Sequence, residues 1–215
     1  IMAKKKKSWL NHHLNDGWVR EAVKQGYRSR AAFKLEQLDK QDKLFKRGQL
    51  VVDLGAVPGG WSQYVARKLQ GAGTVIAIDI LPMADISGVE FVKGDFNDIE
   101  IQNSFADLLN QTKADIVISD MAPNISGVRD KDEAEFSDLF HSILVFIRNN
   151  LRPGGNLVVK GFEGVAAAEL RHKCKRLFQT VRVRKPEASR DKSREHYLVA
   201  KGHLAQYGKQ YDEID

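Results

Sequence analysis

The chain has a single cysteine, Cys174, and no run of apolar residues long enough to cross a membrane. One cysteine excludes a disulfide within the chain and is typical of a reducing compartment, so we expect a cytoplasmic protein. The sequence also lacks the apolar segment of a signal peptide and the paired Cys/His spacing of zinc sites. We therefore predict neither a membrane partner nor a bound metal.

What the chain does contain is typical of one globular domain. It has 215 residues, of which 42% are hydrophobic, and this is enough for a sizeable core. Apolar strands alternate with helices along the sequence, which predicts an α/β fold whose sheet is covered by helices on both faces. Within that domain we expect a basic helical extension over 1–48, a catalytic part over 49–202 and a loosely ordered tail over 203–215.

The most informative segment, Leu50–Trp61, reads as a buried strand followed by a glycine-rich turn and then a helix. Gly55, Gly59 and Gly60 leave the backbone bare, so a small molecule can lie against it at the carboxyl end of the strand. Their spacing is not the G-x-G-x-x-G of dinucleotide-binding folds, and Trp61 stands where a P-loop needs lysine. The D-L-G-A-x-P-G-G pattern favours S-adenosylmethionine as the ligand, with a purely structural turn as the alternative.

Polar side chains follow the strands that come after this loop. We expect a helix from Ser62 to about Leu69 and further strands over Thr74–Asp79, Val89–Lys93, Asp115–Ser119 and Asn156–Val159, the last after a turn at 153–155. Asp79, Asp95, Asp120 and Lys160 then meet at the carboxyl edge of the sheet, with Asp79 placed for ribose hydroxyls and Asp95 for the adenine amino group. The alternative for each acid is the N-cap of the next helix.

The net charge of +6 is concentrated near the two ends of the sequence. The basic residues lie in the first forty positions and again between 182 and 194, interleaved near the start with Trp9, Trp18 and Tyr27. Basic segments with aromatic residues suit a phosphate backbone with exposed bases, although a charge run is often only a solvated surface. We therefore favour a nucleic acid as the partner.

A methyl donor and a nucleic acid leave several acceptor atoms open. Methylation of pyrimidine C5 needs a cysteine nucleophile, and Cys174 lies on a predicted helix away from the strand ends. Methylation of an adenine amino group typically uses an Asn/Asp-Pro-Pro-aromatic sequence, which Asp120–Pro123 does not match. A hydroxyl group is the acceptor that these residues favour, and it needs a base and groups that align its oxygen.

Three residues are candidates for this chemistry. Lys160 ends an apolar strand, where burial and a neighbouring cation would favour the neutral amine that a base requires. Lys34 borders the buried face of its predicted helix and could be that cation, or simply a lysine whose stem covers apolar surface. Glu195 begins a predicted final strand and could orient one lysine, or be a sheet-edge charge. The spacing alone leaves these alternatives open.

The motifs together are similar to one family. Tyr27–Leu35, Asp53–Trp61, Ser119–Asn124, Val158–Lys160 and Ser193–Tyr197 occur in the order found in FtsJ-like RNA ribose 2′-O-methyltransferases, and the resemblance extends from about Trp9 to Gly202. It implies a Rossmann-like, S-adenosylmethionine-dependent methyltransferase whose seven-stranded sheet is mostly parallel, with an antiparallel last strand. It also implies 2′-O-methylation of a uridine ribose in 23S ribosomal RNA of the large ribosomal subunit. Nothing in the sequence demands an oligomer, so we expect a monomer without an obligate protein partner. The same chemistry on tRNA or on another ribosomal RNA site is the alternative.

The resemblance also implies roles for particular residues. The family's catalytic tetrad falls on Lys34, Asp120, Lys160 and Glu195. Its cofactor contacts fall on Gly59, Trp61, Asp79, Asp95 and Asp120. The sequence departs from the family at Val57, where alanine is common, and over Gly161–Gly164, and neither departure touches the tetrad.

Overall fold

The computed structural model describes residues 16–108, 112–123, 126–190 and 193–204 of the chain. The Lys4–Lys7 run, Trp9 and the tail after residue 204 lie outside the described residues.

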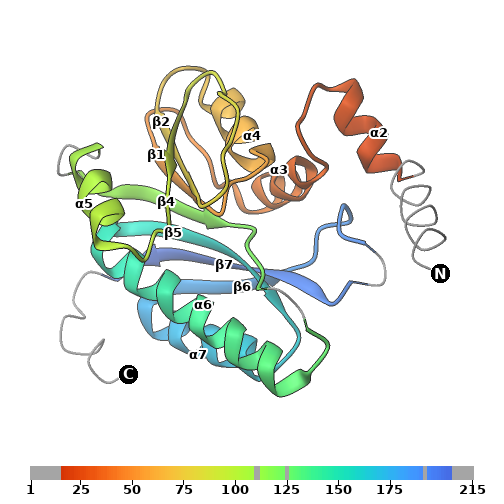
Figure 1. The fold of residues 1–215 in the computed structure, drawn as a ribbon, viewed down its shortest axis with the longest axis vertical. Helices are drawn as coiled ribbons and strands as arrows, with labels where there is room; N and C mark the ends of the chain where they lie inside the picture. Colours follow the sequence, from red (N-terminus) through yellow and green to blue (C-terminus); the bar gives the residue numbers. More distant parts are fainter. Residues whose placement is uncertain (1–15, 109–111, 124–125, 191–192, 205–215) are drawn as a thin grey trace.

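A seven-stranded sheet forms the centre of the molecule (Figure 1). Its strands lie in the order β3-β2-β1-β4-β5-β7-β6, and β7 alone runs against its neighbours. The bounds are β1 Leu50–Leu54, β2 Thr74–Asp79, β3 Val89–Lys93, β4 Ala114–Ser119, β5 Leu151–Phe162, β6 Phe178–Arg184 and β7 Glu195–His203. The predicted mostly parallel sheet with an antiparallel last strand is confirmed. Along the sheet the strand numbers fall from β3 to β1 and then rise from β4. Such sheets bind their ligands at the point where the strand order changes direction, which here lies between β1 and β4.

Helices cover both faces of the sheet, as predicted. The bounds are α2 Gly17–Lys24, α3 Ala31–Asp42, α4 Gly60–Leu69, α5 Ile99–Leu108, α6 Arg129–Asn150 and α7 Val165–Leu177. Side chains of α3 and α4 pack on one face, and those of α5, α6 and α7 pack on the other. None of the described helices is long and apolar enough to cross a bilayer.

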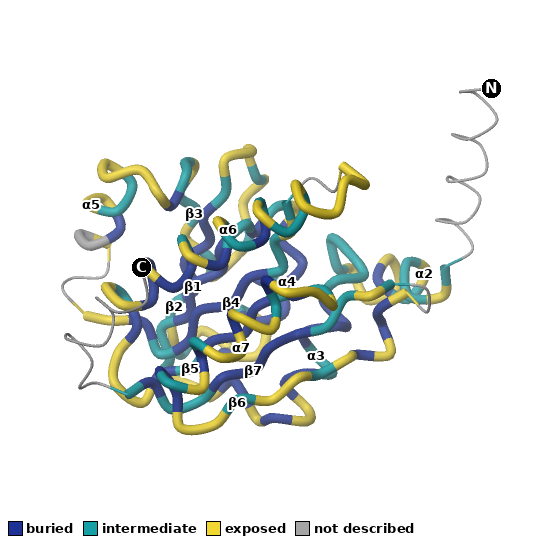
Figure 2. The backbone as a smooth tube through the Cα atoms, turned by 90° about the horizontal axis from the view of Figure 1, so that it is seen from below, coloured by how far each residue is buried: buried dark blue, intermediate teal, exposed yellow. Residues whose placement is uncertain are grey.

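The central strands are apolar almost throughout because both of their faces are covered. Val51 of β1 joins the core under α3 and α4, whereas its neighbour Val52 joins the core under α6. Val158 and Val159 of β5 divide between the two cores in the same way. Figure 2 shows the buried backbone gathered in these strands, with exposed segments around them. A rigid platform therefore supports the carboxyl edge of the sheet.

Several expected boundaries are wrong: β4 begins one residue early, at Ala114, β5 extends beyond Val159 to Phe162, and two larger differences concern the starts of α4 and β5. Helix α4 begins at Gly60, two residues before the expected start, because the left-handed Gly59 already turns the chain into the helix. Strand β5 begins at Leu151, and the turn expected at 153–155 is an irregularity inside the strand. Pairing with β4 passes from Leu151 directly to Asn156, so the intervening residues bulge out of the sheet.

Candidate active site

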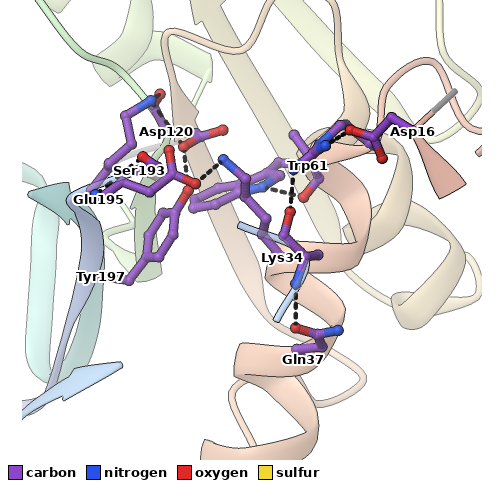
Figure 3. Close-up of polar contacts among 12 residues, drawn as sticks. Asp16, Lys34, Gln37, Trp61, Asp120, Ser193, Glu195 and Tyr197 are labelled. Atoms are coloured by element: carbon purple, nitrogen blue, oxygen red, sulfur yellow. Dashed lines mark hydrogen bonds and ion pairs between the residues drawn. The ribbon is translucent and has the colours of Figure 1, made fainter. Parts of the chain in front are cut away.

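The carboxyl edge of the sheet gathers charged side chains from four elements (Figure 3). Lys34 projects from α3, Asp120 follows β4, Lys160 lies near the end of β5, and Glu195 begins β7. The antiparallel register of β5 and β7 places Tyr197 beside Lys160. The structure therefore brings together the four residues that the sequence assigned to a catalytic tetrad, although they come from distant parts of the chain.

The four residues form two ion pairs with little solvent contact. Lys34 Nζ lies 2.7 Å from Glu195 Oε1, and the side chains of both are 11% exposed. Lys160 Nζ lies 3.1 Å from Asp120 Oδ1, with exposures of 12% and 22%, and also donates to the Asp120 backbone oxygen. Such sheltered pairs are screened far less than surface pairs, so their charges act strongly on a substrate placed between them.

Each lysine has its own carboxylate, since Lys34 pairs with Glu195 and Lys160 pairs with Asp120. Burial opposes the ionisation of Glu195, but the hydrogen bond and charge of Lys34 outweigh it and hold the pKa of Glu195 below its ordinary value. Lys34 is therefore not a lysine that reaches out to solvent. It is a buried cation fixed by a buried anion.

Tyr197 links the two pairs, although no role was predicted for it. Its hydroxyl donates to Asp120 Oδ1 at 2.7 Å, and Lys34 Nζ lies 5.8 Å from the centre of its ring. Burial, with the nearby charge of Asp120, raises the pKa of Tyr197 well above its ordinary value. The phenol therefore stays protonated and keeps donating to Asp120. Its position two residues after Glu195 on the same strand, hence on the same face, was the available signal.

The glycine loop leads from β1 into α4. Its glycines leave room for side chains of other segments, which pack directly against the backbone. Gly55 and Gly59 have left-handed φ angles of 71° and 98°. A methyl group on Gly55 would collide with Met121, and one on Gly59 would lie 2.6 Å from the Ile86 side chain. Trp61 is 3% exposed, and its indole donates to the Ala31 carbonyl. Glycine is therefore required at positions 55 and 59, because apolar side chains of the protein lie directly against the backbone there.

Two of the predicted cofactor carboxylates lie along the same edge. Asp79, at the end of β2, accepts from Val57 N at 2.8 Å, which fastens the glycine loop to the neighbouring strand. Asp95 follows β3 and accepts from the backbone and side chain of Asn97. Asp120 does not cap α6, whose N-cap is Val128, so the alternative assignment fails for that residue. Bare backbone, apolar cover and carboxylates at the edge fit a ligand that carries a ribose and an adenine.

Arg28 fastens the loop from the outside. Its guanidinium donates to the carbonyl oxygens of Ala84 at 2.7 Å, Asp85 at 2.6 Å and Pro58 at 3.4 Å. The sequence placed Arg28 in a basic surface for nucleic acid, whereas the structure uses it to join the glycine loop to the segment after β2. Other arginines of the two basic clusters are also bound within the protein, since Arg30 pairs with Asp16 and Arg184 pairs with Asp42.

Loss of this fastening should reduce cofactor affinity. We expect Arg28→Ala to raise the dissociation constant of S-adenosylmethionine about tenfold, the value of one hydrogen bond to a charged group. Isothermal titration calorimetry measures it, and Arg20→Ala, which removes an exposed arginine from α2, is the matched control. Equal affinities in the two variants would contradict a fastening role for Arg28.

A buried acid lies beneath the loop. Asp53, at the end of β1, accepts a 2.6 Å hydrogen bond from Ser62 Oγ, and burial, with a smaller contribution from the charge of Asp120, raises its pKa to about 7. The native protein therefore holds a proton here that the unfolded chain releases near its ordinary pKa. Stability from this group is fully present below that ordinary pKa and declines as the pH rises towards 7.

Asp53→Asn should remove this dependence, because the amide oxygen still accepts from Ser62 and does not titrate. As the pH is raised from about 4 to about 7, the wild type should lose unfolding free energy through Asp53 and the variant should not. The unfolding free energy of the variant should therefore increase relative to that of the wild type over this range. Urea denaturation across this range measures the difference. Parallel pH profiles for the two proteins would show that Asp53 is ionised in the folded state.

The lysine–carboxylate pairs and the glycine loop lie at the carboxyl edge of the sheet, where open α/β folds bind their ligands. This geometry defines an α/β enzyme that binds its ligand at the switch point of the sheet. The comparison with known families agrees. The FtsJ-like methyltransferase model matches residues 27–203, so this chain belongs to that family. The resemblance drawn from the sequence motifs is confirmed.

The relatives are ribosomal RNA methyltransferases. The chain is 46% identical over 208 residues to the ribosomal RNA large subunit methyltransferase E of Janthinobacterium sp. (strain Marseille), covering 93% of this chain and 97% of the relative. The enzyme of the same name from Burkholderia lata is 46% identical, with coverages of 90% and 93%. A crystal structure of a putative ribosomal RNA methyltransferase from Plasmodium falciparum superposes with a TM-score of 0.75 at 31% identity, covering 83% of this chain and 99% of that one.

Proposed function

We propose that this enzyme transfers a methyl group from S-adenosylmethionine to the ribose 2′-hydroxyl of a uridine in 23S ribosomal RNA of the large ribosomal subunit. The observation that carries the proposal is the pair of sheltered lysine–carboxylate contacts beside the bare glycine loop. The names of the relatives at 46% identity support the substrate.

The cofactor would supply a methyl group on a positively charged sulfur, which is already a good leaving group. The work left to the protein is to align acceptor oxygen, methyl carbon and sulfur, and to take up the hydroxyl proton. The residues that would hold the cofactor are Gly55, Gly59, Gly60, Trp61, Asp79, Asp95 and Asp120.

Lys160 is the base in this proposal. In this role the Lys160 ammonium would first release a proton to solvent, and the neutral amine would then receive the 2′-hydroxyl proton as the oxygen takes up the methyl group. Asp120 holds the amine in place through its side chain and its backbone oxygen. Glu195 fixes Lys34, so that the Lys34 ammonium lies at the same edge and attracts the negative charge that develops on the oxygen. Tyr197 keeps the two pairs in register through Asp120.

Base methylation through a cysteine adduct fits poorly with the structure. Cys174 is fully buried in α7, and burial raises the pKa of its thiol to about 12, so a nucleophilic thiolate is not available. A nicotinamide dehydrogenase is disfavoured by the glycine spacing of the loop.

The decisive experiment uses large ribosomal subunits from a strain that lacks the endogenous enzyme. Tritium transfer from labelled S-adenosylmethionine is followed by nuclease digestion and nucleoside chromatography. We expect the label in 2′-O-methyluridine. Label on a base would overturn the roles given to the lysines. Label on tRNA and none on subunits would keep the chemistry and change the substrate.

A further inference from the structure

A second pocket lies just beyond the catalytic residues. It has a volume of about 310 Å³ and is bounded by the ends of β5 and β7 and by helices α6 and α7. Its apolar wall consists of Phe136, Phe140 and Phe162, and Arg129 and Arg194 also line it. Neither the proposed chemistry nor the proposed cofactor site uses these side chains.

The pocket adjoins the candidate active site along the chain, because its lining residues Phe162 and Arg194 lie two residues and one residue from Lys160 and Glu195. Phe162 pairs with Glu195 across β5 and β7, two steps along the ladder from the pairing of Lys160 with Tyr197. Two residues of strand span about 6.6 Å, so the Phe162 wall of the pocket begins within about one nucleoside's length of the Lys160 backbone. The glycine loop joins β1 to α4, on the opposite side of Lys160 in the strand order. A nucleotide whose hydroxyl is at Lys160 can therefore extend into the pocket without meeting the cofactor.

The lining favours a flat aromatic ring next to a phosphate. The rings of Phe136 and Phe162 lie 4.9 Å apart and are tilted, so both present apolar surface to the pocket. Of the three acids in the lining, Glu133 accepts from Val165 and Ala166 and Asp132 accepts from Ser126 and Gly127, whereas Glu163 is exposed to solvent. Arg129 and Arg194 are both exposed, so they can reach a phosphate at the pocket mouth.

We propose that this pocket takes the base of the methylated nucleotide, turned out of the RNA stack, and so helps to select the nucleotide that is modified. Single-stranded RNA is recognised by stacking unstacked bases on aromatic side chains and arginine planes, and this pocket offers both. The inference rests on the proposed function, because it takes the acceptor to be a ribose held at Lys160. It adds a site for the base, built from α6, α7 and the end of β5.

Filling the pocket tests this proposal. Ala167 of α7 lines the pocket, whereas the next residue, Ala168, is exposed and does not, so Ala167→Phe and Ala168→Phe form a matched pair. We expect Ala167→Phe to raise KM for unmethylated large subunits about 5- to 100-fold, the range of a base–aromatic contact, with unchanged affinity for S-adenosylmethionine. Ala168→Phe should behave as the wild type. Equal KM values for the two variants would contradict the proposal that the pocket binds the base of the methylated nucleotide.

A second variant guards against misfolding of the first. Phe162→Leu keeps an apolar side chain in β5 and removes only the aromatic face, so it should also raise KM for subunits while its melting temperature stays near that of Ala168→Phe.

A benzophenone amino acid at position 167 identifies the occupant of the pocket by ultraviolet cross-linking and primer extension. A stop at the methylated nucleotide is expected, and cross-links only to ribosomal protein or distant RNA would refute the proposal. A wild-type enzyme that labels no ribosomal RNA would overturn the proposed function itself, whereas labelling with equal KM values overturns the pocket alone.

Discussion

Lys160→Met should lower kcat for methyl transfer to large subunits by a factor of about 10²–10⁴, the contribution of a well-placed general base. Methionine nearly matches the length of lysine but carries no exchangeable proton, so the shape of the site is kept while its base is lost. The cofactor site over the glycine loop does not include this amine, and the dissociation constant of S-adenosylmethionine should be unchanged. Single-turnover transfer of labelled methyl groups measures the first quantity, and calorimetry measures the second.

Two further variants separate proton transfer from charge. Lys160→Arg keeps the positive charge beside Asp120 but provides a group that stays protonated, so it should be nearly as inactive as Lys160→Met. Lys40→Met removes an exposed lysine of α3, paired only with Glu36 one turn away, and should transfer methyl groups at the wild-type rate. An active Lys160→Arg enzyme would assign Lys160 an electrostatic role and leave the proton to water.

The fold was predictable because its signals are local. Strands buried on both faces, such as β1 and β4, must be apolar throughout, and the alternation of strands with helices then limits the sheet to a few topologies. The two larger boundary errors arose where local signals were overruled. Gly59 starts α4 early through its left-handed backbone, and pairing with β4 carries β5 past the residues expected to form a turn.

The contacts of the site were less accessible to sequence, because they depend on which side chains meet across the sheet edge. Helical spacing placed Lys34 beside buried surface but could not show that Glu195, far along the chain, would meet it. Net charge suggested that Arg28 faces RNA, whereas three carbonyl oxygens of distant loops bind it. The role of Tyr197 required the register of β5 with β7. In each case the missing information was the identity of a tertiary partner.

The pair of Lys34 and Glu195 gives the second large prediction. Both side chains are nearly buried, so Lys34→Met leaves the Glu195 carboxylate without its counter-charge in a poorly solvated site. We expect this variant to lose about 3–5 kcal/mol of unfolding free energy at neutral pH, the usual result of breaking a buried pair. Lys40→Met breaks the exposed Lys40–Glu36 pair on the same helix and should cost no more than about 0.5 kcal/mol. Urea denaturation measures both.

The pH dependence gives this prediction a signature that general damage to the fold would not produce. In the wild type the pKa of Glu195 is held below its ordinary value, so its stabilisation is present at neutral pH and is lost as the pH falls through that lowered pKa. In Lys34→Met, burial acts on Glu195 without the opposing lysine and favours its protonated form. Acidification therefore neutralises the unpaired carboxylate and removes its cost to the stability of the variant. The stability gap between the two proteins should therefore narrow towards about pH 4.

The double variant Lys34→Met/Glu195→Gln separates structure from chemistry. Removing both charges leaves no unpaired ion in the site, so the double variant should be more stable than Lys34→Met alone, and the free-energy changes of the single variants should not add. If the pair served only to hold α3 against β7, this stable double variant would regain methyl transfer. We expect it to remain at least about tenfold impaired in kcat, because the cation that attracts the developing charge on the ribose oxygen is still missing. A double variant with wild-type kcat would limit Lys34 and Glu195 to the architecture of the site.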